Sequence, residues 1–151
     1  MQNNTLTADF RSFEAVLLEN TSSDLFYKAL AAGRIRKFIS LFTRRPSRLQ
    51  DLSSSKSNWN GHYAGMREVA LDDIRGTEGR LDAFDDRFNP LTDKTRQRWQ
   101  SVAKAFEVGI DLPPVELIQV GQTYFVRDGH HRVSVARARG QTTILAEVTV
   151  H

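Results

Sequence analysis

The sequence predicts an α+β fold, in which a small mixed sheet with helices follows a helical amino-terminal segment. Three observations support this fold class. Apolar residues recur at spacings of three and four over residues 6–45, a Ser- and Asn-rich stretch covers residues 50–61, and strand-like and helix-like segments alternate after residue 66. We therefore expect a helical, basic segment over residues 1–49, a linker over residues 50–65, and a mixed domain over residues 66–151.

The amino-terminal segment predicts two helices rather than one. Helical spacing in the first is carried by Leu6, Phe10, Phe13 and Leu17. The polar residues 20–23 interrupt this pattern, because Ser, Thr and Asn favour caps and turns over helix interiors. A second helix then runs to about residue 45, and Pro46 stops it.

In the first half of the mixed domain, the sequence predicts a strand and then a helix. The strand covers residues 68–71, and the turn-rich stretch 76–88 leaves room for a short helix. The longer helix is capped by Thr92 or Asp93 and ends at Gly109. Its expected buried face consists of Trp99, Val102, Ala103 and Phe106.

In the second half of the domain, the sequence predicts a hairpin, a helix and a last strand. The hairpin joins strands over residues 115–120 and 123–127, with Gly121 and Gln122 at its turn. A helix over residues 133–138 and a strand over residues 143–150 follow. The order of the domain is therefore strand, helix, hairpin, helix, strand.

Composition excludes several classes of protein. The chain has no cysteine, which excludes disulfides, thiolate nucleophiles and Cys-based zinc sites. No apolar run approaches the roughly 20 residues that cross a bilayer, and the polar amino terminus lacks the pattern of a signal peptide. We expect a cytoplasmic protein.

Basic charge is concentrated in residues 28–48, which hold seven basic residues and no acid, whereas the rest of the chain has 14 basic and 18 acidic residues, a net charge of −4. Such a segment suits packing on the domain or a second subunit, binding to nucleic acid, or lying on an anionic membrane surface. The residues that would contact nucleic acid are Arg34, Arg36, Lys37, Arg44, Arg45 and Arg48.

The most informative motif is a strand, a tight turn and a helix that begins on the turn, formed around Asp128, Gly129, His130, His131 and Arg132. A helix start presents unpaired backbone N–H groups and the positive end of the helix dipole. Arg132 in the first turn is opposed by that dipole, which favours a bound anion such as phosphate. Two alternatives stay open: Gly129 serves only the turn, and Asp128 is only the helix N-cap. The adjacent His130 and His131 point about 100° apart, so they cannot readily chelate one metal.

These residues resemble the ParB/sulfiredoxin-like superfamily, which includes the amino-terminal domain of ParB chromosome-partition proteins, sulfiredoxins and small free-amino-acid kinases. Gly129, His131 and Arg132 match the sulfiredoxin form Gly-Cys-His-Arg, and His130 stands at the cysteine position. The turn at Gly79 and Arg80 resembles the superfamily's first basic box. The resemblance covers residues 66–150 and implies a nucleotide phosphate site at residues 129–132, which Arg80 would complete.

The sequence departs from both named relatives. Sulfiredoxin chemistry needs a cysteine, which is absent. ParB proteins carry a helix-turn-helix domain after this fold, for which the chain leaves no room, so we expect a stand-alone member of the superfamily.

Three function classes follow. The first is a nucleotide-binding regulatory or switch module, in which ATP, ADP or CTP sits at residues 128–132 and alters the packing of the amino-terminal helices. The second is a small Mg²⁺-dependent phosphoryl-transfer or phosphoesterase (nuclease-like) enzyme, with His131, Asp128 or Glu78 as catalytic candidates and Asp72 and Asp73 as metal ligands. The third is a DNA-associated protein that binds through residues 28–48. A homodimer fits each class, and the first is favoured.

Overall fold

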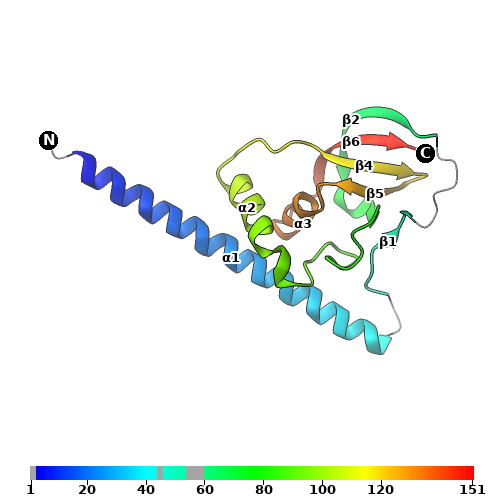
Figure 1. Cartoon of the computed structure of the whole chain (residues 1–151), viewed down its shortest axis with the longest axis horizontal. Coiled ribbons are helices and arrows are strands. Elements are labelled where there is room, and N and C mark those ends of the chain that lie inside the picture. Colours follow the sequence, from blue (N-terminus) through cyan, green and yellow to red (C-terminus); the bar gives the residue numbers. More distant parts are fainter. Residues whose placement is uncertain (1–2, 44–45, 54–59) are drawn as a thin grey trace.

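The computed structural model describes residues 3–43, 46–53 and 60–151. Within these residues the fold is α+β, as predicted: a long helix precedes a six-stranded mixed sheet and two shorter helices (Figure 1). Helix α2 (Arg96–Glu107) packs on both α1 (Asn3–Thr43) and α3 (His130–Ala138), and α3 contacts the sheet at β4 (Val115–Val120). The helices therefore connect the sheet to α1.

The sheet brings distant segments together. Its strand order is β1-β3-β5-β4-β6-β2, where β1 is Gln50–Asp51, β2 is His62–Ala70, β3 is Ile74–Thr77, β5 is Thr123–Asp128 and β6 is Thr143–Val150. β3 and β5 are parallel, with Thr77 beside Val126. Because parallel strands end at the same edge of a sheet, the segments that follow Thr77 and Asp128 lie close together. The predicted hairpin is confirmed, with β4 and β5 antiparallel and joined at Gly121 and Gln122.

The prediction of two amino-terminal helices is wrong, because α1 is continuous over 41 residues. The polar residues 20–23 do not break it, since the Thr21 hydroxyl donates to Leu17 O (2.9 Å) and the Ser22 hydroxyl donates to Glu19 O (3.0 Å). Such bonds to the preceding turn satisfy the hydroxyls inside a helix. Ser22 is buried against the domain, so its small side chain also suits the packing.

The linker is shorter than expected among the described residues. Gln50 and Asp51 form β1 beside β3, and β2 begins at His62, six residues before the predicted start of that strand. Leu71, predicted as the end of the strand, instead opens a short 3₁₀ helix, Leu71–Asp73. Residues 54–59 of the predicted linker lie outside the described residues.

No helix forms over the described residues 76–88. Gly76 and Thr77 complete β3, and the chain then turns around the fully buried carboxylate of Asp85. This carboxylate accepts the backbone N–H groups of Arg87 (2.9 Å) and Asn89 (2.8 Å) and the Asn89 side-chain amide (2.9 Å). The predicted cap at Thr92 or Asp93 starts a 3₁₀ turn (Asp93–Thr95) that leads into α2, and Thr92 makes no side-chain cap bond.

The larger of the two hydrophobic clusters found among the described residues includes residues from α1. Phe26, Ala29 and Leu30 of α1 are buried in the same cluster as Trp99 and Val133. The Phe26 and Trp99 rings meet edge to face at 5.5 Å, and the Trp99 indole N–H donates to Ser134 Oγ at 2.7 Å. The middle of α1 is therefore part of the folded core. None of the helices in the described part of the chain combines the length and apolar character that a bilayer crossing requires.

Candidate functional site

Gly129 makes the turn between β5 and α3. Its φ of 96° lies in the left-handed region, and a Cβ at this position would stand 2.6 Å from Val115 Cγ1. Both features require glycine. Gly129 itself occupies the N-cap position, so the prediction that Asp128 caps the helix is wrong; the Asp128 carboxylate instead accepts a hydrogen bond from Arg132 Nη2 at 2.6 Å.

A cavity of about 320 Å³ opens at the start of α3. Three segments far apart in the sequence line it: the loop after β3, the first turns of α2 with the stretch before β4, and the Gly129 turn. The lining residues are Arg80, Arg98, Val102, Leu112, Pro113, Asp128, Gly129, His130, His131 and Arg132. The structure thus brings together all five residues predicted to bind phosphate, including Arg80.

His131 supplies an unpartnered polar atom in this cavity. Its side chain is buried (8% exposed), and among the described residues its Nε2 has no hydrogen-bond partner. Burial, with the nearby Arg98 and Arg80 charges, lowers the pKa of His131 to about 4. The imidazole is therefore neutral at pH 7, and its Nε2 can donate to an anion when it carries the ring proton.

His130 has a structural role that the sequence did not indicate. Its Nε2 lies 2.6 Å from the hydroxyl oxygen of Thr77, which also accepts the backbone N–H of Arg80 at 3.2 Å. Burial is the main cause that lowers the pKa of His130 to about 4, and Arg80 adds to it. Thr77 and His130 together fix the Arg80 loop beside the start of α3.

Arg132 is held in place by the protein itself. Its guanidinium donates to the backbone carbonyls of Pro113 and Pro114 (2.8 Å for Pro114) as well as to Asp128. Only 13% of the side chain is exposed. Arg132 therefore adds positive charge to the cavity while it ties the stretch before β4 to α3.

Arg80 and Arg98 are the exposed cations of the cavity. In the described parts of the chain neither guanidinium forms an ion pair with an acid. Sequence reasoning missed Arg98, because only the fold brings α2 next to Gly129. The available signal was that Arg98 lies four residues before Val102, which places it on the same helix face, next to Trp99.

Of the predicted acidic residues, Glu78, Asp72 and Asp73 do not line this cavity. Glu78 pairs with Arg127 (3.0 Å), and Asp72 pairs with Arg137 (3.5 Å) near the far end of α3; Asp73 adjoins Asp72 in the same 3₁₀ turn. Within the residues that the structure describes, no group of three His, Cys, Asp or Glu side chains could hold a metal. Asp128 is the acid that lines the cavity, and it is bonded to Arg132.

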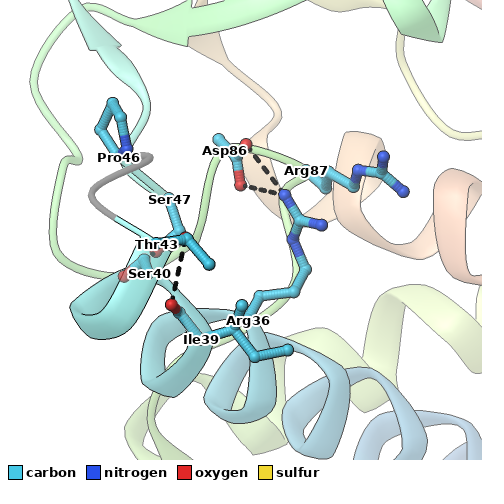
Figure 2. A pocket seen from close by; sticks show the side chains of 8 residues that line it. All are labelled: Arg36, Ile39, Ser40, Thr43, Pro46, Ser47, Asp86 and Arg87. Atoms are coloured by element: carbon cyan, nitrogen blue, oxygen red, sulfur yellow. Dashed lines mark hydrogen bonds and ion pairs between the residues drawn. The ribbon is translucent and has the colours of Figure 1, made fainter.

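The basic segment is partly turned toward the domain. Figure 2 shows Arg36 of α1 reaching to Asp86. Its Nη2 donates to both carboxylate oxygens of Asp86, at 2.9 and 3.0 Å. Both residues line a second cavity of about 460 Å³. The hydrogen bonds to Asp86 keep the pKa of Arg36 above its ordinary value, and the buried Asp85, 3.3 Å away, adds to this. Arg34 pairs with Asp93 (3.3 Å) and Arg48 with Asp82 (3.8 Å), and Lys37 is exposed. Arg44 and Arg45 lie outside the described residues.

The cavity at Gly129 has the chemistry of an anion site. Free N–H groups of the first turn of α3, the His131 Nε2 atom and the guanidinium groups of Arg80 and Arg98 converge there. Backbone N–H groups and guanidinium groups both match the tetrahedral oxygens of phosphate. The arrangement can bind and neutralise a phosphate group.

The chain is similar in structure to sulfiredoxin from Arabidopsis thaliana. The TM-score is 0.40 at 20% sequence identity, and the similarity covers 55% of this chain and 82% of that one. No protein-family model and no curated protein sequence matches the chain.

Proposed function

We propose that this protein binds the phosphate groups of a nucleotide in the cavity at the start of α3. The observation that carries the proposal is the buried, unpartnered Nε2 of His131, which lies in a cavity walled by Arg80 and Arg98. An unsatisfied buried polar atom is costly, so its presence calls for a partner. An anion at this place would accept hydrogen bonds from His131 and from the N–H groups of α3 together.

The rest of the ligand has room next to the phosphate cavity. A further cavity of about 400 Å³, distinct from the one at Arg36, shares Leu112, Pro113 and Arg132 with it. Its walls include the apolar side chains of Phe106, Ile110, Ile144 and Leu145. A polar cradle beside an apolar groove suits a molecule with a phosphate end and a flat, weakly polar end. This favours a nucleotide over inorganic phosphate.

A regulatory role follows from the position of α2. One face of this helix presents Arg98 to the cavity, and the opposite face contacts α1. Across that contact Arg96 donates to the Tyr27 hydroxyl (2.7 Å), Gln100 donates to the Ser23 hydroxyl (3.0 Å), and Lys104 pairs with Glu19. A phosphate that binds Arg98 therefore acts on α2, the helix that contacts α1. We therefore propose a nucleotide-responsive module rather than a simple storage site.

The test is calorimetric titration of ATP, ADP, CTP, GTP and inorganic phosphate, each with Mg²⁺, into the wild type and Arg98→Ala. Arg98 is exposed and forms no ion pair with the acids of the described residues, so its loss should spare the fold. We expect it to weaken nucleotide binding about tenfold or more, as for the loss of a hydrogen bond to a charged group. The matched control is Arg67→Ala, an exposed arginine on the outer strand β2, which should bind like the wild type. Equal affinity in Arg98→Ala and the wild type, or no binding of any nucleotide, would refute the proposal.

A further inference from the structure

Helix α1 carries an apolar stripe that its own domain leaves largely exposed; at the edges of the stripe, Tyr27 bonds to Arg96 of α2 and Ile39 lines the cavity beside Arg36. Nine large apolar side chains of this helix are between 47% (Tyr27) and 75% (Phe42) exposed. We call them the outer stripe: Phe13, Val16, Leu17, Tyr27, Ile35, Phe38, Ile39, Leu41 and Phe42. At about 100° per residue, the buried residues of α1 lie roughly opposite the stripe around the helix axis. They are Ser22, Phe26, Ala29 and Leu30. Exposed apolar surface of this extent marks an interaction site.

The amino-terminal part of α1 extends beyond the rest of the molecule (Figure 1). Residues 11–17 are exposed all round the helix, so no element among the described residues packs on them. A helix without tertiary contacts is marginally stable in water, because its stability comes mainly from packing an apolar face. The projecting helix with its apolar stripe therefore fits a partner that covers it.

Charge along the helix points to a second copy of the same chain. Residues 9–24 contain four acids and one base, a net charge of −3, whereas residues 25–43 contain four bases and no acid. Arg34, Arg36 and Glu19 pair with the domain of their own chain, whereas Lys28 and Lys37 have no acidic partner among the described residues. Two copies that pack antiparallel place the acidic half of each helix along the half of the other that carries these two lysines. Parallel packing would place Asp24 beside Asp24, and like charges across a helix pair are unfavourable.

The apolar positions agree with the antiparallel arrangement. When Phe13 lies opposite Phe42 of the second copy, Leu17 lies opposite Phe38, and Asp24 lies opposite Ala31, one turn from Lys28. Phe38 and Phe42 already form a joint ring surface, with ring centroids 5.1 Å apart. The two apolar clusters of the stripe thus meet each other, while in its middle Asp24 meets a small residue and Asn20 lies opposite Ile35.

The exposed apolar area of the stripe is on the scale of a dimer interface. A fully buried aromatic side chain removes about 150–250 Å² of surface from water. The four rings of the stripe are only partly exposed within one chain, so together they offer on the order of 450 Å² per copy. Five aliphatic side chains add to this, and the sum approaches the roughly 800 Å² per partner of a specific interface. We infer that the protein is a symmetric homodimer in which two α1 helices pack antiparallel through the outer stripe.

Cysteine cross-linking tests both the contact and its direction, because the chain has no cysteine of its own. Phe13 and Phe42 of one chain are about 44 Å apart along the helix, so they cannot form a disulfide within it. Mild oxidation of the double variant Phe13→Cys/Phe42→Cys should give a disulfide-linked dimer, while Phe13→Cys alone and Phe42→Cys alone should stay uncross-linked. Cross-linking of both single variants would mean parallel helices and would overturn the arrangement.

The second measurement is the mass in solution by light scattering. We expect about twice the 17.2 kDa of one chain for the wild type and for the control Thr43→Glu, an exposed residue outside the stripe at the same end of α1. Phe38→Glu should give a folded monomer, because Phe38 is 62% exposed within one chain. A wild type that is monomeric, or that uses α1 as a monomer to bind duplex DNA with steep salt dependence, contradicts the proposal.

Discussion

His130 and His131 are neighbours in sequence but have separate roles. Adjacent residues on a helix point about 100° apart, so His130 turns to the Thr77 hydroxyl while His131 faces the cavity. Each ring also contacts Phe84, which closes the apolar side of the pair. The site therefore uses one imidazole to fix its geometry and leaves the other for a ligand.

These two histidines should make stability depend on pH. Both have a pKa near 4 in the folded protein, below the ordinary 6.5, so the unfolded chain takes up protons first as the pH falls. Their contribution is complete above about pH 6.5 and is lost between that pH and about 4, at up to about 1.4 kcal/mol per pH unit for each ring. Urea unfolding at several pH values measures this loss. His131→Asn should show a shallower decline than the wild type; an equal slope would contradict the assignment.

Gly129 should tolerate no side chain. We expect Gly129→Ala to lower the free energy of unfolding by about 2–4 kcal/mol, because alanine is strained at φ 96° and its Cβ meets Val115. Gly140→Ala is the matched control: its φ is 74°, but nothing lies within 4 Å of the added Cβ, so it should lose only about 1–2 kcal/mol. Thermal unfolding compares the two. Equal losses would show that the close contact with Val115 has no effect.

Asp85 should be the most sensitive acid of the chain. Its carboxylate is fully buried and accepts three hydrogen bonds in the loop before α2, in addition to the charge of Arg36. Replacing it by Ala leaves those three donors unsatisfied and removes one of the two acids beside Arg36, so we expect a loss of about 3–5 kcal/mol in unfolding free energy. Asp86→Ala, which removes the half-exposed partner of the same arginine, should lose about 1 kcal/mol or less. Chemical denaturation distinguishes the two variants.

At the scale of helices and strands, the sequence could predict the elements whose position depends on local residues. The β4–β5 hairpin depends on Gly121, and the start of α3 depends on Gly129, so both were predicted correctly. The continuity of α1 was not, because Thr21 and Ser22 bond to their own helix instead of capping a new one. The pairing of β1 with β3 and the loop around Asp85 depend on contacts between distant segments, which periodicity does not reveal.

The contact between α1 and the domain should stabilise the whole fold. Phe26 is fully buried against Trp99, so Phe26→Ala should lower the unfolding free energy by about 3–5 kcal/mol. Thr21→Ala, an exposed position of the same helix, should change it by less than about 0.5 kcal/mol. Denaturation followed by Trp fluorescence measures both. A small effect of Phe26→Ala would mean that α1 is only loosely attached.

At the scale of the molecule, the candidate site forms where three segments meet. The sequence predicted the Gly129 turn and Arg80, because both belong to a recognisable local pattern. It could not predict Arg98 or the bond between Thr77 and His130, because these depend on the packing of α2 and on the parallel pairing of β3 with β5. The same packing links the cavity to α1 through α2, which is the physical basis of the proposed response to a ligand.

The most direct test of the phosphate site is an NMR titration of the isotope-labelled protein with ATP and Mg²⁺. We predict the largest shifts in the backbone amide signals of His130, His131 and Arg132, since their N–H groups lie in the first turn of α3 and would face the phosphates. The control Arg67→Ala should give the same pattern. Shifts confined to α1, or no shifts at millimolar nucleotide, would contradict the assignment of this cavity as a nucleotide phosphate site.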